Sequence, residues 1–514
     1  MSARTTMGGK WGVLATSCVL ILIIALNTTA INTAVNSIAD DLNLTSSSLT
    51  WAINIYLLAV AAIVAVTGRL GDIIGVRRLI LIGLVVFLVG SVLTATAQDG
   101  VSLIAGRACQ GFGSAFLMPG SMQALQQAFP KDERATALGA WGAVGGIGFA
   151  IGPLFGGAWT DLVSWRGIFW SDIPLIILAF VLALMTLGGL PAPKNHKPID
   201  LVGAAVLAVA VFLLVFGLQR SEFWGFDSPE FWVTMGASAA SFGAFALIET
   251  KRRFPLIHLR LFRIPPYVGS IVGTFASTAA LIGMLYFFNL FVQSPVTLDE
   301  SAVTASLALL PYGVMMFIFS LWSGPIAQRI GFAIPVGGGL ALSALGFIWF
   351  AAVADELSIS SLWIPITLSG IGVGLTFSTA GSAGLAAVPQ DSVGEAAGAV
   401  NVARYVGGAL GLAVGSALYN SRALDRFNES LAQEGITGAE RGDLDNALTG
   451  SAAGLESAIN DLGNPPAESV ARAAADALVA GLEAALLFMA AVALIGAVAV
   501  VTTMRRGSRE ASSP

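Results

Sequence analysis

The chain consists mainly of long apolar runs, and their length is what most limits how it can fold. A helix needs about 20 mostly apolar residues to cross a bilayer, and we count about fourteen such runs. Their approximate limits are 11–33, 49–67, 79–97, 103–127, 137–160, 168–190, 200–218, 229–249, 268–292, 303–324, 332–354, 361–386, 396–419 and 478–503. Only 11% of the residues are charged, whereas soluble domains carry about 25%. The sequence therefore predicts an all-α integral membrane protein.

The distribution of Lys and Arg supports this count. With a cytoplasmic N-terminus, 18 of the 26 basic residues fall on inner loops and 6 on outer loops. Cytoplasmic loops of membrane proteins carry an excess of Lys and Arg. We therefore expect a multi-pass protein of the plasma (inner) membrane with both termini in the cytoplasm. Abundant Ala and Gly with few Lys favour a bacterial source.

Residues 420–476 form the one long stretch without a predicted span. They hold ten acidic residues against four basic ones, and they include the pair Pro465-Pro466. We expect this segment outside the membrane, either as short helices over 425–434 and 467–476 or as a flexible acidic loop.

Weak internal repetition divides the chain into halves. Glycines and a few polar residues of the first half recur 256 or 259 residues later, which is typical of transporters built from parallel repeats. The matched sets are Gly68, Asp72, Gly75 with Gly324, Gln328, Gly331, and Gly148, Gly152, Gly156 with Gly407, Gly411, Gly415. We expect an N-terminal six-helix bundle over 1–190, an inserted transmembrane hairpin with cytoplasmic linkers over 191–264, a C-terminal six-helix bundle over 265–505 that includes loop 420–476, and a cytoplasmic tail over 506–514.

Four segments carry recognisable patterns. A charged, glycine-punctuated turn, GRLGDIIGVRR, spans 68–78; its arginines and aspartate are costly in lipid and predict a membrane surface. Residues 107–113 read RACQGFG and place an arginine inside an apolar run, where such a residue usually faces a polar cavity. Residues 145–157 read GGIGFAIGPLFGG, in which small residues at every fourth position allow close helix packing. The first run contains LNTTAINTAVN over 26–36.

Together these segments resemble the motifs of the major facilitator superfamily, in particular its fourteen-span drug:proton antiporter group typified by QacA and EmrB. The resemblance covers about residues 11–505. It implies two six-helix bundles plus an inserted two-helix hairpin. It also implies secondary active export of small amphipathic or hydrophobic compounds by alternating access, coupled to proton antiport, with substrate held near the bilayer midplane.

The resemblance assigns roles to three of the segments. The turn would be a conformational latch on the cytoplasmic side, built on Gly68, Asp72, Gly75, Arg77 and Arg78. Arg107 would take part in proton coupling or in the response to substrate. The antiporter motif, with Gly148, Gly152, Pro153, Gly156 and Gly157, would favour export over uptake. From the residues alone, the arginines of the turn could merely set topology, Arg107 could snorkel to the interface, and the glycines could serve only packing.

The first span departs from the family pattern. Asn27 stands where the group usually has aspartate, and an amide cannot carry a proton. Asp172 stands where the group usually has asparagine, so the two positions read as an exchange. Alternatively, Asp172 caps a helix that begins at Pro174. Glu483 is a further proton-coupling candidate, whereas Glu395 reads as a charge at a helix start.

Polar residues inside the other spans are candidates for the substrate cavity. They are Asn27, Asn32, Tyr56, Arg107, Gln110, Tyr286, Asn289, Gln293, Asn401 and Arg404. Arg404 could meet a carboxylate or an anionic substrate, while both histidines fall in loops and argue against a histidine relay.

Other function classes lack support. No phosphate-binding GxxxxGK[ST] loop, nucleophile–base set, clustered metal ligands or basic stripe is present, so we expect no enzyme, no cofactor, no metal and no nucleic-acid partner. The expected partners are a small-molecule substrate, protons and membrane lipids, and the expected state is a monomer. Because Asn27 cannot titrate, an uncoupled facilitator or a lipid or metabolite exporter stays open. A non-transporting membrane sensor or scaffold, using loop 420–476 as its binding face, is a third alternative.

Overall fold

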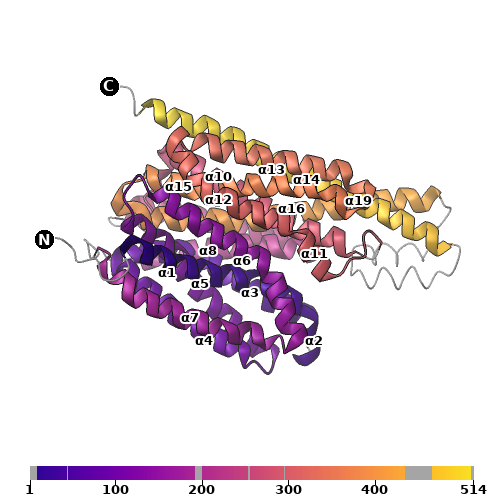
Figure 1. Cartoon of the computed structure of the whole chain (residues 1–514), viewed down its shortest axis with the longest axis horizontal. Helices are drawn as coiled ribbons and strands as arrows, with labels where there is room; N and C mark the ends of the chain where they lie inside the picture. Colours follow the sequence, from indigo (N-terminus) through magenta and orange to yellow (C-terminus); the bar gives the residue numbers. More distant parts are fainter. Residues whose placement is uncertain are drawn as a thin grey trace.

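The computed structural model describes residues 9–42, 44, 46–191, 200–252, 255–294, 296–433 and 466–510, and all secondary-structure elements in these ranges are helices (Figure 1). In this part of the chain, thirteen helices are long and apolar enough to cross a membrane. The all-α membrane fold is therefore confirmed. The first half contains α1 (Gly9–Thr29), η1 (Ala30–Ala34), α2 (Val35–Leu42), α3 (Ser46–Ile74), α4 (Val76–Ala95), α5 (Gly100–Ala128), α6 (Arg134–Leu162), α7 (Arg166–Thr186) and η2 (Leu187–Gly189).

The second part of the chain continues in the same manner. It contains α8 (Leu201–Trp224), α9 (Pro229–Lys251), η3 (Leu259–Arg263), α10 (Pro265–Gln293), α11 (Ala302–Ala308), α12 (Leu310–Ile330), α13 (Ala333–Val353), η4 (Ala354–Glu356), α14 (Ile359–Phe377), α15 (Thr379–Ala387), η5 (Gln390–Ser392), α16 (Val393–Gln433) and α19 (Pro466–Glu510). The expected span 361–386 is interrupted at Ser378, where α14 gives way to α15.

The fourth expected span, α5, is 29 residues long but less apolar than the other membrane-length helices. Its position explains the difference, because α5 packs against α1, α3 and α4 and buries polar side chains along its length. A helix surrounded by protein does not need an apolar face toward lipid.

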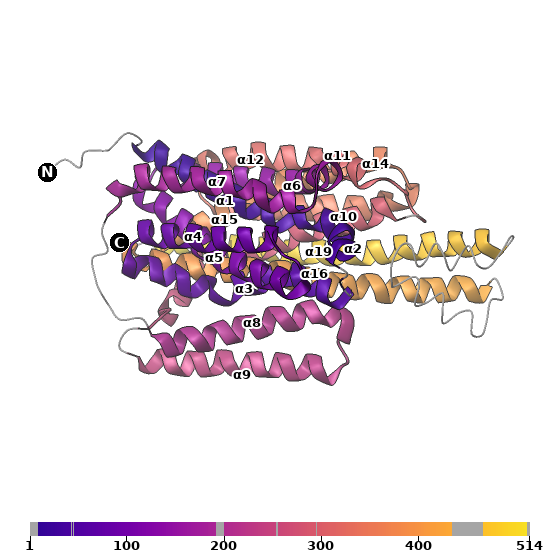
Figure 2. The same ribbon diagram turned by 90° about the horizontal axis from the view of Figure 1, so that it is seen from below.

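The helices form two groups that pack along a shared seam (Figure 1). Helices α1 and α3–α7 contact one another, as do α10, α12–α16 and α19, and the seam is made chiefly by α3 against α16 and α6 against α12. Helices α8 and α9 lie side by side outside both groups (Figure 2), where α8 packs on α3 and α16. The hairpin therefore covers one edge of the seam.

Helices α16 and α19 are longer than the expected spans, with 41 and 45 residues, and project beyond the other helices (Figures 1 and 2). Residues 420–433 and 466–476 continue these two helices, so the expectation of separate short helices at 425–434 and 467–476 is wrong. The apolar stripe continues past the membrane: Phe427, Leu431, Val470 and Ala474 are all fully buried in one cluster. The centre of the predicted loop, 434–465, lies outside the described residues.

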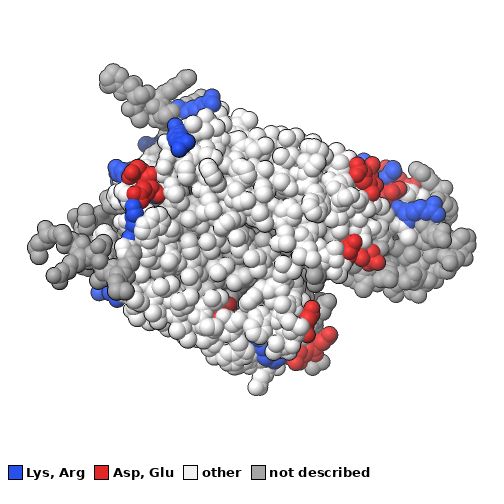
Figure 3. All heavy atoms as spheres, in the orientation of Figure 1, with Lys and Arg blue, Asp and Glu red and all other residues white. Residues whose placement is uncertain are grey.

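Charged groups lie at the two ends of the molecule, and the surface between them is almost free of charge in this view (Figure 3). Basic groups gather at the end where α1 begins and α19 ends. This end is the one that the loop charges predict to be cytoplasmic, and we refer to it as the inner end.

Candidate functional site

A cluster of polar side chains is buried inside the first half, and four helices contribute to it. Asn27 comes from α1, Ser91 from α4, Arg107 and Gln110 from α5, and Asp172 from α7; every one of these side chains is buried. Hydrogen bonds join the five groups into one unit, which we call the polar cluster.

Asp172 accepts hydrogen bonds from three neutral donors. Asn27 Nδ2 donates to Asp172 Oδ1 at 2.7 Å, Ser91 Oγ donates to Oδ2 at 3.2 Å, and Gln110 Nε2 lies 3.4 Å from Oδ2. Gln110 Nε2 also lies 2.9 Å from Ser91 Oγ and 3.1 Å from Asn27 Oδ1. Asp172 sits inside α7, which begins at Arg166 and continues through Pro174. The alternative that Asp172 caps a helix beginning at Pro174 is therefore wrong.

Arg107 points into this cluster. Its side chain is 1% exposed, Nη1 donates to Gln110 Oε1 at 2.9 Å, and Nη2 lies 3.5 Å from the carbonyl oxygen of Asn27. The guanidinium stacks on the ring of Tyr56 at 4.4 Å and lies 5.9 Å from the ring of Phe169. An arginine held in this way does not snorkel to the interface, so that alternative is wrong too.

Ser91 of the polar cluster and the neighbouring Phe169 were not among the predicted site residues. Ser91 lies in an otherwise apolar run, and Phe169 lies three residues before Asp172 in the same run. Only the packing of α4 and α7 against α1 and α5 brings them to Asp172 and Arg107.

The charged turn joins the two halves at the inner end. Asp72 Oδ1 accepts a hydrogen bond from the backbone N–H of Gly394 at 3.1 Å, at the start of α16, and Arg69 Nη1 lies 3.5 Å from Asp72 Oδ2. A carboxylate is favoured at a helix N-terminus. Gly68 allows this approach, because a Cβ there would lie 2.6 Å from the Gly394 carbonyl oxygen. Gly75 turns the chain with a φ of 92°, which favours glycine.

The arginines that follow the turn have different surroundings. Arg77 and Arg78 are exposed, and Arg77 Nη2 donates to the carbonyl oxygen of Leu184 at 3.4 Å. Asp72 therefore pairs with Arg69 and the start of α16, whereas Arg77 and Arg78 face outward at the membrane surface.

The repeated position in the second half makes a matching contact. Gln328 Nε2 donates to the Asp132 carbonyl oxygen and lies 3.1 Å from Thr136 Oγ1, at the start of α6. A Cβ on Gly324 would meet the backbone of Ala135 and Thr136. The seam is thus closed at the inner end by two equivalent contacts, one from each half.

The antiporter motif lies against the helix that carries Asn27. A Cβ on Gly148 would lie 2.7 Å from Ala25 Cβ, and Cβ atoms on Gly152 and Gly156 would run into Thr29 and the Ala30 carbonyl oxygen. Helix α6 runs unbroken through Pro153, and nothing lies within 4 Å of a Cβ on Gly157. Three of the four glycines therefore set the distance between α6 and α1.

Other predicted site residues lie elsewhere. Asn32 is exposed on η1, and Asn289 and Gln293 pair with each other near the end of α10, where Tyr286 is half-buried. Glu483 lies within α19 and is half-buried. These residues do not join the polar cluster.

Glu395 is more than a surface charge at a helix start. Its side chain is fully buried. Glu395 Oε2 accepts a hydrogen bond from the backbone N–H of His258 at 3.1 Å, and it lies 3.0 Å from His258 Nδ1. The pair ties the segment after α9 to the start of α16.

At the outer end, an ion pair joins α2 to the start of α7. Asp41 on α2 pairs with Arg166 at the start of α7 and accepts from Trp165 Nε1 at 3.2 Å. The Arg166 hydrogen bond, together with that from Trp165, holds the pKa of the Asp41 carboxyl below its usual value. The ionised Asp41 carboxylate therefore adds to the free energy of unfolding above about pH 4, the pKa of an unfolded aspartate. This stabilisation is lost as the pH falls through the lower pKa that Asp41 has in the folded state.

Comparison with known proteins places this arrangement in a family. The family model described as Major Facilitator Superfamily matches residues 17–412. The chain belongs to the major facilitator superfamily. It is 29% identical to the tetracenomycin C resistance and export protein of Streptomyces glaucescens, over 84% of this chain and 79% of that protein. It is 31% identical to a triacylglyceride transporter of Mycolicibacterium smegmatis, over 84% of this chain and 78% of that protein.

The fold agrees with solved members of the superfamily. The crystal structure of the human organic anion transporter MFSD10 superposes with a TM-score of 0.63, covering 96% of this chain and 99% of that chain at 14% identity. At that identity the likeness shows the fold alone.

Proposed function

We propose that this transporter exports amphipathic or hydrophobic small molecules from the bacterial cytoplasm by proton antiport. It would act as a monomer in the plasma membrane, with both termini in the cytoplasm. Similarity to an antibiotic resistance and export protein supports the direction of transport, as does the close packing of the antiporter motif on α1. The two inner contacts of Asp72 and Gln328 supply a closure that must open for alternating access.

The main support for proton coupling is the 2.7 Å hydrogen bond between Asn27 and Asp172. The carboxylate that α1 lacks is present in the same cluster, supplied by α7. A carboxylate can take up and release a proton, whereas the amide of Asn27 cannot.

The cluster also links the proton to Arg107. Asn27 and Gln110 both contact Asp172, and both accept from Arg107, at 3.5 Å and 2.9 Å. When Asp172 is ionised it attracts the amide N–H groups, which keeps both amide oxygens turned toward Arg107. Protonation of Asp172 weakens that hold and frees Arg107 to move, so a proton can alter the packing of α1, α5 and α7 together.

The test uses the purified protein in proteoliposomes with an imposed pH gradient. Transport of the dyes 8-anilino-1-naphthalenesulfonate and N-phenyl-1-naphthylamine is followed for wild type, Asp172→Asn and, as a matched control, Asp355→Asn at an exposed position. We expect pH-driven accumulation in wild type and in the control, and its loss in Asp172→Asn with dye binding retained. Unchanged pH-driven transport in Asp172→Asn would refute Asp172 as the proton carrier.

An uncoupled lipid or metabolite exporter is the second candidate. It is favoured by the amide at Asn27 and by similarity to a triacylglyceride transporter. The same proteoliposomes separate the two, because equal accumulation with and without the gradient in wild type would rule out proton antiport.

A further inference from the structure

Arg404 is a second buried arginine, and its surroundings differ from those of Arg107. It lies on α16, its side chain is 4% exposed, and its guanidinium stacks on the ring of Phe377 at 4.1 Å. Nη2 donates to the Phe377 carbonyl oxygen at 3.1 Å, close to the break at Ser378 between α14 and α15. Nε and Nη1 have no hydrogen-bond partner within the part of the chain that the structure describes.

No acidic side chain compensates this charge. Among the described residues, Arg404 forms no salt bridge. Asp172 and the rest of the polar cluster belong to the other half of the molecule. A buried charge without a partner is strongly unfavourable, and the two unused donors add the cost of lost hydrogen bonds. The site is therefore incomplete without an anion.

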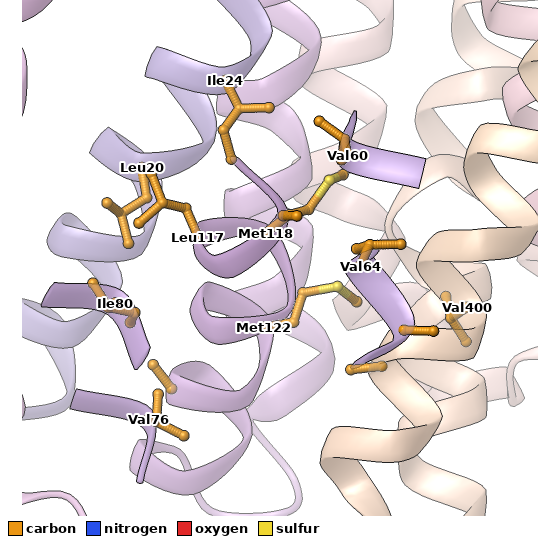
Figure 4. Packing of buried hydrophobic residues seen from close by; sticks show 14 of the residues in the cluster. Leu20, Ile24, Val60, Val64, Val76, Ile80, Leu117, Met118, Met122 and Val400 are labelled. Atoms are coloured by element: carbon orange, nitrogen blue, oxygen red, sulfur yellow. The ribbon is translucent and has the colours of Figure 1, made fainter. Parts of the chain in front are cut away.

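The position of Arg404 is on the seam between the halves. Neighbouring side chains of α16 cross to α5: Asn401 Nδ2 lies 3.5 Å from Met122 Sδ, and the Tyr405 hydroxyl lies 3.3 Å from Met118 Sδ. Figure 4 shows Met118 of α5 directed toward Val60 of α3, and Met122 of α5 directed toward Val64 of α3 and Val400 of α16. Asn401 Oδ1 is also buried without a partner.

Aromatic side chains lie on another side of Arg404. The Arg404 guanidinium lies over the face of the Phe377 ring. The ring of Phe149, from α6, packs edge-on against the Phe377 ring with 6.3 Å between the ring centroids. Methionine and aromatic side chains suit an apolar ligand of variable shape. The groups around Arg404 thus offer one cationic fork beside adaptable apolar surfaces.

A cavity of about 280 Å³ lies at the inner end of the seam, and α15, the helix that follows Phe377 and Ser378, contributes to its lining. Its lining includes Lys131, Arg134 and Gln126, and no Asp or Glu among the described residues. Ser382 also lines it, and the adjacent Gly381 lies close to Arg404: a Cβ there would be 3.9 Å from Arg404 Nη2 and 3.3 Å from Met122 Cε. A Cβ on Gly381 would also lie 3.5 Å from Val400 Cγ1, so Gly381 packs next to Arg404, Met122 and Val400 one residue away from the cavity lining.

We infer that Arg404 binds the anionic group of the exported substrate, so that the substrates are amphiphilic anions with an apolar body held between α5, α6 and α14. This inference rests on the proposed export function and specifies its substrate class. Carboxylates, sulfonates and phosphates each present two oxygens that can accept from the paired donors of a guanidinium, an arrangement that lysine cannot reproduce.

The test compares two dyes that differ by one group: 8-anilino-1-naphthalenesulfonate is N-phenyl-1-naphthylamine with an added sulfonate. Equilibrium binding of each to the full-length protein is measured in phosphatidylcholine nanodiscs, with empty nanodiscs subtracted. We expect Arg404→Gln to weaken sulfonate binding about tenfold or more and to leave binding of the neutral dye unchanged. Sulfonate affinity that does not change would overturn the inference.

Three further arms complete the design. Arg329→Gln removes an exposed inner-end arginine and should alter neither affinity. Arg404→Lys keeps the charge but not the fork, so sulfonate binding should weaken less than in Arg404→Gln; if Arg404→Gln does not fold, an unchanged sulfonate affinity in Arg404→Lys overturns the inference. Loss of Arg404-dependent sulfonate binding on adding phosphatidylglycerol would assign the site to a lipid headgroup instead. Because no proton gradient is used, failure here is distinct from failure of pH-driven export.

Discussion

At the scale of single residues, the exchange between Asn27 and Asp172 is open to a direct test by reversing it. The two side chains are 2.7 Å apart, so a carboxylate on either α1 or α7 would lie in the same polar cluster. We expect Asn27→Asp combined with Asp172→Asn to recover the pH-driven dye transport that Asp172→Asn alone loses. No recovery, in a double variant that binds dye normally, would mean that the carboxylate must come from α7.

The single variant Asn27→Asp has a different expected result. It places two carboxylates within hydrogen-bond distance, and like charges so close cannot both ionise without cost. We expect its thermal stability to fall more steeply than that of wild type as the pH rises from about 5 to about 8, because loss of the shared proton leaves two neighbouring negative charges in the variant and one in wild type. A thermal-shift series in detergent measures this, and parallel curves for the two proteins would contradict it.

The sequence alone reached part of this cluster. Asn27, Arg107, Gln110 and Asp172 were found because they occupy motif positions, two of them with the unexpected residue type. Ser91 was beyond reach, since a lone serine in an apolar run is common and its partner is 81 residues away. Asn289 and Gln293 were included because they are polar, but they satisfy each other near the end of α10.

At the scale of helices, the antiporter motif provides a matched pair of substitutions. Gly156 and Gly157 are adjacent on α6, yet a Cβ on Gly156 would strike the Ala30 carbonyl oxygen, whereas one on Gly157 meets nothing within 4 Å. We expect Gly156→Ala to destabilise the protein by about 1–3 kcal/mol through overpacking, and to reduce transport because α1 carries Asn27.

The control is Gly157→Ala, which should be neutral or stabilising by up to about 1 kcal/mol because alanine favours helix. Both are compared by thermal unfolding in detergent and by dye transport in proteoliposomes. Equal behaviour of the two variants would mean that α6 and α1 are not held at a fixed distance.

The helix lengths show which helix limits the apolar runs of the sequence predict and which they miss. Apolar runs located the spans, since the bilayer demands them, but they gave no reason to extend α16 and α19 beyond the membrane. There the burial of Phe427 and Leu431 against α19 maintains the helix, a contact between segments distant in sequence. Conversely, the run 103–127 was counted as a span, although the polar side chains of α5 make this helix less apolar than the others.

At the scale of the whole molecule, the two repeat-related contacts at the inner end determine which side of the seam is closed. Asp72 joins α3 to the start of α16, and Gln328 joins α12 to the start of α6. A hydrogen bond to a charged group contributes about 1.5–3 kcal/mol and a neutral one about 0.5–1.5 kcal/mol. Each contact is therefore sufficient to shift a two-state equilibrium by roughly two- to a hundredfold.

We expect Asp72→Asn and Gln328→Ala to open the inner end modestly when made singly and clearly when combined, because each single variant leaves the other contact in place. Spin labels at Lys131, in the turn before α6, and at Arg329, in the last turn of α12, report the separation by pulsed electron paramagnetic resonance, because both residues are exposed and lie on opposite halves. The double variant should show a longer and broader distance distribution than wild type, and Asp355→Asn should match wild type. If the double variant keeps the wild-type distribution, the apolar packing of α3 on α16 and of α6 on α12 holds the seam closed by itself, and the latch has no part in setting the conformational equilibrium.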